Sequence, residues 1–129
     1  MPLSWRQLAS LLGPAGPMQP QLALLASPQA NDRRILLRAP QVLTISRVDA
    51  VLTGGTSPSV SFSLRHGTDV SAAGTAATTD PITVTSTTTG ESWISLDNPV
   101  IPAGSWLWIV VNAVSGTAAS LHISVLIST

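Results

Sequence analysis

The chain has 129 residues, of which only 9% are charged, and its formal net charge is zero. A typical soluble domain carries about 25% charged residues. Six scattered arginines and no lysine cannot form the dense basic surface that nucleic acid binding requires. No apolar run approaches the roughly 18 residues of a membrane span, and the absence of cysteine excludes disulfides and thiolate sites. Because near-zero net charge favours association, we expect other subunits to cover much of the surface.

The chain divides near residue 31 into a predicted N-terminal anchoring arm, residues 1–31, and a domain, residues 32–129. The arm begins with a predicted short helix, since Ser4 and Gln7 have the spacing of a capping box. Four apolar residues then fall on one helix face: Trp5, Leu8, Ala9 and Leu12. Two turns are too short to be stable alone in water. This stripe must therefore dock, either on its own domain or on another subunit.

The rest of the arm reads as an extended spacer followed by a second apolar patch. Residues 13–18 contain two collagen-like triplets, too few for a triple helix, and with Pro20 they predict a polyproline segment. A signal peptide is the alternative, but prolines interrupt the apolar stretch and Arg6 is the lone basic residue near its start. The predicted partner-binding residues of the arm are Trp5, Leu8, Leu12, Leu22, Leu24 and Leu25.

From residue 32 onward, apolar residues recur with the period of two that is typical of β-strands. Residues 42–53 are partly apolar on both faces, so we expect cover on both sides of that strand. Residues 105–113 form a near-continuous apolar run, which predicts a central strand. The last strand reaches the final residue without a tail, so we expect it to pair inside a sheet. The predicted strands cover 35–39, 42–53, 59–65, 82–85, 93–96, 105–113 and 121–129, with a loop over 66–80.

Seven or eight short strands, separated by turn signals every eight to twelve residues, predict an all-β fold. The fold class that we expect is an antiparallel β-sandwich of jelly-roll-like type, preceded by the extended arm with its one short helix. No alternation of strand and helix supports a parallel α/β fold.

A serine-hydrolase constellation must be considered, because His66 and Asp69 stand three residues apart beside Ser63 and Ser71. The sequence shows no nucleophile elbow, however, and serine is abundant throughout the chain. The alternative is that Asp69 caps a turn and His66 bonds to loop backbone. We therefore predict no catalytic residue, and enzymatic activity remains only a remote alternative.

The sequence predicts neither a metal site nor a cofactor. Asp69, Asp80 and Asp97 lie in predicted loops, where calcium binding competes with ordinary turn chemistry, but calcium loops place their carboxylates closer together. His122 shares a strand face with Ser124 and has no second histidine or cysteine at ligand spacing, so a solvent-facing or intersubunit position is expected.

Trp106 and Trp108 lie two residues apart on one face of the strand over 105–113. This spacing predicts that both rings belong to the core. Tryptophan is also enriched at interfaces and stacks on sugar rings, so a binding role is the alternative. No carbohydrate pocket can be assigned from the sequence.

Several segments resemble segments that recur in small β-rich structural proteins of tailed bacteriophages. In order, they are residues 62–75 (Phe62-Ser63-Leu64-Arg65-His66-Gly67-Thr68-Asp69 and onward), 86–90, 101–108 (Ile101-Pro102-Ala103-Gly104-Ser105-Trp106-Leu107-Trp108) and 114–117. The resemblance covers roughly residues 42–129 and omits the arm. It implies a virion β-sandwich domain of the kind found on capsid decoration or fibre-type proteins, often as a trimer.

Two functions follow as expectations. The first is a capsid decoration (cement) protein on the virion surface, which forms a homotrimer and attaches to the phage head through its arm. Its expected partner is the major capsid protein or another virion protein. The alternative is a receptor-binding or fibre/baseplate module on the phage tail. Neither function calls for nucleic acid, a membrane or a cofactor.

Overall fold

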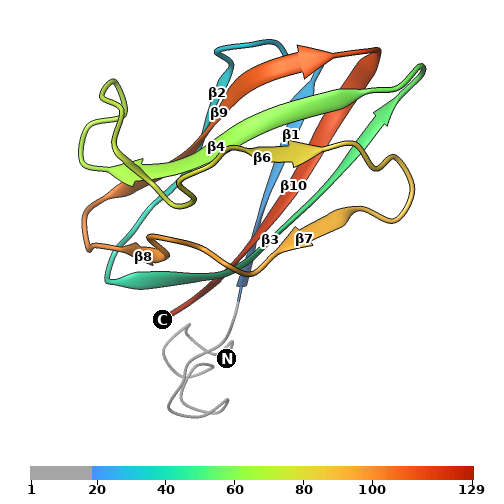
Figure 1. The fold of residues 1–129 in the computed structure, drawn as a ribbon. Helices are drawn as coiled ribbons and strands as arrows, with labels where there is room; N and C mark the ends of the chain where they lie inside the picture. Colours follow the sequence, from blue (N-terminus) through green and yellow to red (C-terminus); the bar gives the residue numbers. More distant parts are fainter. Residues whose placement is uncertain (1–18) are drawn as a thin grey trace, which may run out of the picture.

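A computed structural model describes residues 19–129, which form ten strands arranged in two antiparallel sheets that pack face to face (Figure 1). The prediction of an antiparallel β-sandwich is confirmed. The predicted helix, together with Trp5, Leu8 and Leu12, lies outside the described residues.

The two sheets contain five strands each. Sheet A has the order β1 (Gln19–Ala26), β10 (Ala118–Ser128), β3 (Leu43–Gly54) and β7 (Glu91–Trp93), with β8 (Val100–Ile101) also pairing with β3. Sheet B has the order β2 (Arg33–Arg38), β9 (Trp106–Ser115), β4 (Ser59–Gly67) and β5 (Thr75–Ala76), with β6 (Ile82–Val84) also pairing with β4. The chain thus crosses between the two sheets several times, and strands that are far apart in the sequence, such as β1 and β10, become neighbours in one sheet.

The core lies between the sheets and is built from alternate residues of each long strand. In β4, Val60, Phe62 and Leu64 are fully buried, while Ser59 and Ser61 are half-buried on the outer side. Burying a side chain of this size contributes about 1.5–3 kcal/mol, so strict alternation selects which face turns inward. The buried residues of the other sheet include Val48, Leu52, Leu121 and Val125.

A β-bulge explains why both faces of β3 read as apolar. Ile127 pairs with Ile45, but the preceding Leu126 pairs with Arg47, so the register shifts by one residue within β3. The extra residue changes the phase of the strand, as bulges do. Leu43 and Ile45 before the shift, and Val48, Ala50 and Leu52 after it, therefore all face the core. The expected cover on both sides is wrong, because one side of β3 faces outward along its length.

Residues 19–26 belong to the sandwich rather than to an extended arm. β1 pairs with β10 over its whole length, from Gln19 opposite Ile127 to Ala26 opposite Ser120. Pro20 lies inside this strand and not in a polyproline spacer. The leucine-rich stretch follows a period of two, with Ala23 and Leu25 buried and Leu22 and Leu24 exposed. The sandwich thus includes the described residues from Gln19 onward, which lie before the predicted boundary near residue 31.

The remaining strands follow the sequence pattern with local differences. β10 lies between β1 and β3, which confirms that the C-terminal strand pairs inside a sheet. β7 ends at Trp93, earlier than predicted, and leaves Ile94 exposed. The two-residue strands β5 and β8 were not predicted, since so short a segment carries no periodic signal.

Candidate functional site

A shallow groove lies on the outer face of sheet A. Its volume is about 770 Å³, and residues from β1, β10, β3 and β7 line it. Strand pairing fixes the rows that form its floor. Leu22 lies beside Ser124 and then Asp49, while Leu24 lies beside His122 and then Val51. β1 therefore contributes two leucines to the groove, and the charged groups of its lining come from Arg34 of β2, Arg47 and Asp49 of β3, and Glu91 of β7.

Asp49 organises the polar groups beside it in the groove. Arg47 Nε donates to Asp49 Oδ2 at 2.9 Å, and the Ser92 hydroxyl on β7 donates to the second carboxylate oxygen. Both side chains of this ion pair are substantially exposed, so solvent screening leaves it worth little to stability. Its effect is local: the charges of Arg47 and Asp49 neutralise each other and leave no net charge at this point of the groove.

His122 faces outward beside Ser124, as expected from the sequence. Its Nε2 lies 2.9 Å from Ser120 Oγ, and Ser120 in turn contacts the hydroxyl of Thr53 on β3. No carboxylate bonds to His122 among the described residues. A serine–histidine contact on a flat strand surface lacks the buried acid and the oxyanion donors that nucleophilic catalysis needs. The contact therefore orients the imidazole at the rim of the groove.

The three arm leucines that the structure describes do not act alike. Leu22 is 75% exposed and Leu24 is 50% exposed, and both line the groove. Leu25 is 8% exposed and belongs to the core. The prediction that Leu25 binds a partner is wrong, because its side chain points between the sheets. Period-two alternation in residues 22–25 was the signal that could have separated them.

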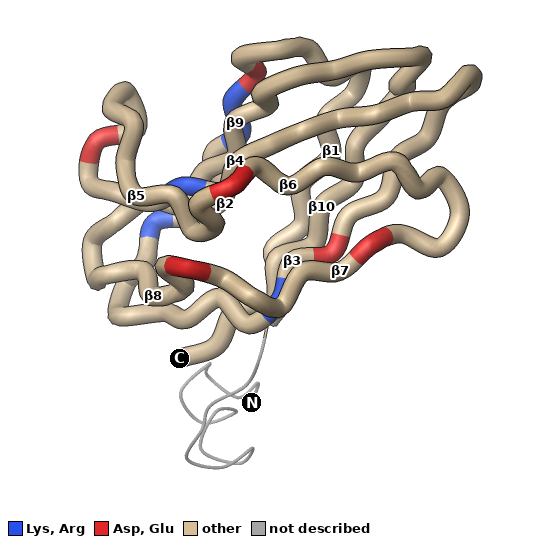
Figure 2. Tube along the Cα trace, in the orientation of Figure 1, with Lys and Arg blue, Asp and Glu red and all other residues tan. Residues whose placement is uncertain are grey.

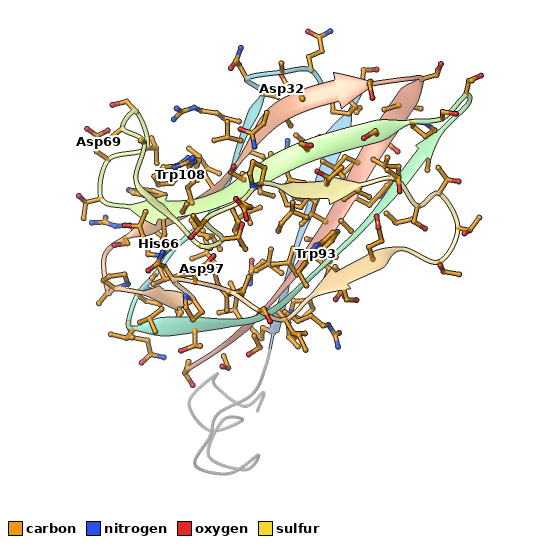
Figure 3. All side chains as sticks on the ribbon, viewed as in Figure 1. Asp32, His66, Asp69, Trp93, Asp97 and Trp108 are labelled. Carbon is orange, nitrogen blue, oxygen red and sulfur yellow. The ribbon has the colours of Figure 1, made fainter. Side chains whose placement is uncertain are left out.

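The serine, histidine and aspartate residues that were considered as a hydrolase constellation, and not predicted to form one, do not come together. His66 is buried on the core side of β4, and its Nε2 lies 3.1 Å from the backbone oxygen of Asn98. Asp69 is on the loop beyond β4 (Figure 3), where it accepts from Ser71 N at 2.9 Å and from Ser71 Oγ at 2.6 Å. Ser63 is buried and accepts from Asn112 Nδ2 at 2.8 Å. The alternative roles, turn capping and backbone bonding, are the ones that the structure shows.

The loop aspartates also serve backbone groups. Asp97 Oδ2 accepts from Thr79 N at 2.6 Å, which ties two loops together, and the backbone oxygen of Asp80 accepts from the Thr78 hydroxyl. Within residues 19–129, no three His, Cys, Asp or Glu side chains are grouped so that they could hold a metal ion.

Trp108 is fully buried, but it lies outside the core between the sheets. Leu107, Ile109 and Val111 of β9 face that core, so Trp108 points to the outer side of sheet B. There the loop between β4 and β5 covers it (Figure 3). The expected core position is right in that Trp108 is buried. It is wrong in that the side chain lies on the outer side of sheet B and not between the sheets. Trp106 is only half-buried, and the Arg38 guanidinium lies 5.5 Å from its ring centroid.

Two arginines fasten the loop over the Trp108 ring. Arg33 donates to the backbone oxygen of Val70, and Arg65 Nη1 donates to that of Ala73 at 3.1 Å. The loop backbone approaches the indole so closely that a Cβ on Gly74 would lie 2.6 Å from Trp108 Cη2. The indole Nε1 has no hydrogen-bond partner among the described residues. Arg33 and Arg65 thus hold a structural cover and leave no opening beside the indole.

The two capping aspartates predict how stability depends on pH. The hydrogen bonds from Ser71 lower the pKa of Asp69, and those from Thr79 lower the pKa of Asp97, both from 3.8. A depressed folded-state pKa contributes stability at pH values above the unfolded pKa, and this contribution is lost as pH falls through the folded pKa. We therefore expect the urea concentration at the unfolding midpoint to decrease as the pH is lowered below 4. This decrease should be smaller in the double variant Asp69→Asn/Asp97→Asn.

The control is Asp80→Asn, since the Asp80 carboxylate makes no hydrogen bond within residues 19–129. When urea midpoints are measured from pH 6 to pH 2.5, this variant should show the same dependence of the midpoint on pH as the wild type. An acid dependence that is equal in the double variant and the wild type would contradict the capping role of Asp69 and Asp97.

Comparison with protein-family models, curated proteins and solved structures gives no match for this chain. Residues 19–129 contain no helix with the length and apolar character needed to cross a bilayer. The function must therefore be inferred from the surface itself. Sequence reasoning missed the groove, because it depends on β1 lying beside β10, and this pairing joins residues about a hundred positions apart.

Proposed function

We propose that this chain is a non-enzymatic structural protein of a bacteriophage particle, which decorates the head and assembles with copies of itself. The observation that carries the proposal is the placement of Leu22 and Leu24 on the outside of a charge-poor sandwich. Exposed apolar groups on a neutral surface favour association with another protein surface. The segment resemblance to phage structural proteins supports the same conclusion.

The order of strands supports a jelly-roll assignment for the sandwich. If β5 and β6 are counted as one strand, and β7 and β8 as another, sheet A reads 1-8-3-6 and sheet B reads 2-7-4-5. This is the interleaved order of eight strands folded as two Greek keys, an architecture used by viral capsid and lectin domains. Fold alone does not fix function, so this order supports a virion role without selecting head or tail.

Attachment to the head is assigned to the residues before β1. The predicted helix stripe of Trp5, Leu8 and Leu12 belongs to this segment, which continues directly into β1. Several such segments on one assembly would bind a particle far more tightly than one, because the later contacts become intramolecular. An assembly of copies would carry one such segment per copy.

Binding to purified phage heads that lack the protein tests this assignment. The variant Trp5→Ser/Leu8→Ser/Leu12→Ser should bind heads at least tenfold more weakly than the wild type, since each lost apolar contact contributes on the order of 1 kcal/mol or more. Co-sedimentation of full-length protein with heads measures this. Deleting residues 1–30 would be a poor test, because it would remove β1 and strip one edge from sheet A.

The matched control is Val42→Ser/Ile94→Ser/Val100→Ser, which removes three exposed apolar side chains from the sandwich. This control should bind heads normally. Undiminished binding by the Trp5, Leu8 and Leu12 variant would refute attachment through the N-terminal segment.

A tail receptor-binding module is the second candidate, favoured by the half-buried Trp106 ring beside Arg38. Such a ring can stack on a sugar. A glycan array that shows binding abolished by Trp106→Ala would favour this function over head decoration, and a blank array would count against it.

A further inference from the structure

Most strand edges of the sandwich are protected against pairing with another chain. Exposed edges are normally blunted by short strands, charges or bulges. The edges formed by β5, β6, β7 and β8 are each two or three residues long. β2 is longer, but it carries three arginines and a register shift between Ile35 and Leu37.

β1 has almost none of these protections. It is eight residues long, pairs with β10 without a register shift, and contains no charged residue. The tube beside its label in Figure 2 is tan. Pro20 near its start is the one protective feature, and Leu22 and Leu24 are exposed beside the free edge. Among the edge strands of residues 19–129, β1 is therefore the one suited to accept another strand.

We propose that β1 pairs antiparallel with β1 of a second copy of this chain, across a twofold axis. The pairing joins the two A sheets into one continuous sheet. This inference rests on the self-assembly in the proposed function and names the contact that makes it. It holds whether the particle contact is on the head or the tail.

The backbone of β1 has hydrogen-bonding groups free for this contact. Ser27 donates its N–H to the Ala119 oxygen on β10. Because N–H groups alternate in direction along a strand, those of Leu22 and Leu24 point away from β10. Pro20 lies in the same phase, so its missing N–H leaves the pairing with β10 intact, as expected for proline on an edge strand.

The positions of the leucines define the register. With the twofold axis at Ala23, Leu22 lies opposite Leu24 of the second copy, and Leu24 lies opposite Leu22 of the second copy. Four leucines then form one cluster on the outer face, and directly opposed apolar pairs of this kind stabilise antiparallel strands. A shift of the axis to Leu22 or Leu24 would lose one of these two cross-strand contacts.

Charge favours a second copy as the occupant and β1 as the strand. Twofold pairing of identical strands places each surface patch against itself. The same pairing through β2 would gather Arg33, Arg34 and Arg38 of both copies along one short contact, and like charges held close together are destabilising. β1 itself carries no charge. The adjacent groove is lined by two arginines, Arg34 and Arg47, and by two carboxylates, Asp49 and Glu91, so its formal charges balance.

Analytical ultracentrifugation of the full-length protein tests the proposal. We expect a concentration-dependent dimer in the wild type and at least a tenfold weaker association for Leu22→Lys. Ile94→Lys is the matched control, because Ile94 and Leu22 are both 75% exposed and the control lies away from β1. It should dimerise normally. A monomer at all concentrations, or a dimer or trimer insensitive to Leu22→Lys, would overturn the proposal.

Cysteine cross-linking tests the register, and the chain has no native cysteine to interfere. In the double variant Leu22→Cys/Leu24→Cys, opposed residues lie about 5.5 Å apart, within disulfide range. In either single variant the nearest equivalents are diagonal, at about 7–8 Å, which is too far. We expect dimer cross-links from the double variant and few from the single variants. Equal cross-linking by a single variant would refute the axis at Ala23.

Discussion

Replacing Trp108 with alanine is expected to lower the free energy of unfolding by about 3–5 kcal/mol, the range for removing a large buried aromatic side chain. Trp108 is fully buried, although it lies on the outer side of sheet B. Its ring is the platform on which the loop between β4 and β5 rests, with Gly67 and Gly74 in close approach. Losing the ring removes packing from both the strand and the loop, so residues 68–74 should also become more susceptible to proteolysis.

The variant Trp108→Phe separates ring packing from the indole N–H. Phenylalanine keeps an aromatic ring against the loop and removes the unpaired Nε1. A buried donor without a partner costs about 1–3 kcal/mol, which offsets part of the lost volume. We expect Trp108→Phe to cost less than about 2 kcal/mol. Urea unfolding followed by circular dichroism measures both variants, and a loss below 1 kcal/mol for the alanine variant would contradict the packed position of Trp108.

The long strands could be predicted from the sequence, because one face of each is buried. Alternation in β4 and β10 marks the faces correctly: Val60, Phe62 and Leu64 face the core, and His122 faces outward. β3 could not be interpreted this way. Its bulge after Ile45 reverses the alternation, and nothing local in the sequence fixes where an extra residue will be accommodated.

The surface was less predictable, because it depends on which distant segments meet. β1 was assigned to an arm since its leucines follow a proline-rich segment, and only its pairing with β10 separates Leu25 from Leu22 and Leu24. Trp108 was expected in the core. Its cover is a loop held by Arg33 and Arg65 from two strands, a contact that spacing along the chain cannot show.

Most charged side chains in residues 19–129 make hydrogen bonds within the chain itself. Of the eleven charged side chains in residues 19–129, nine make a hydrogen bond to the chain itself, and Arg34 and Asp80 do not. Arg33 and Arg65 hold the loop over Trp108, and Asp69 and Asp97 cap backbone N–H groups. Because charged residues are few and most of them bond within the chain, surface strands such as β1 carry no charge. A neutral strand of this kind suits contacts between identical subunits.

Replacing Gly116 with alanine is expected to lower the free energy of unfolding strongly, although the substitution removes no side-chain contact. Gly116 has a φ of 67°, where an L side chain is strained by about 1–2 kcal/mol. A Cβ there would also lie 2.1 Å from the backbone oxygen of Ser57. This backbone cannot easily move, since the turn containing Gly116 is tied to the neighbouring turn by Thr117 N donating to Thr56 O at 3.0 Å. We expect a total loss of about 3–4 kcal/mol.

Gly104→Ala isolates the cost of the backbone conformation. Gly104 has a similar φ of 83°, but a Cβ there would meet nothing within 4 Å. Its substitution should cost only about 1–2 kcal/mol, the strain of the left-handed conformation alone. The difference between the two variants in urea unfolding therefore measures how tightly the connection between β9 and β10 packs on that between β3 and β4. Equal losses would mean that these two turns separate at little cost, and that the hydrogen bond from Thr117 to Thr56 does not hold them together.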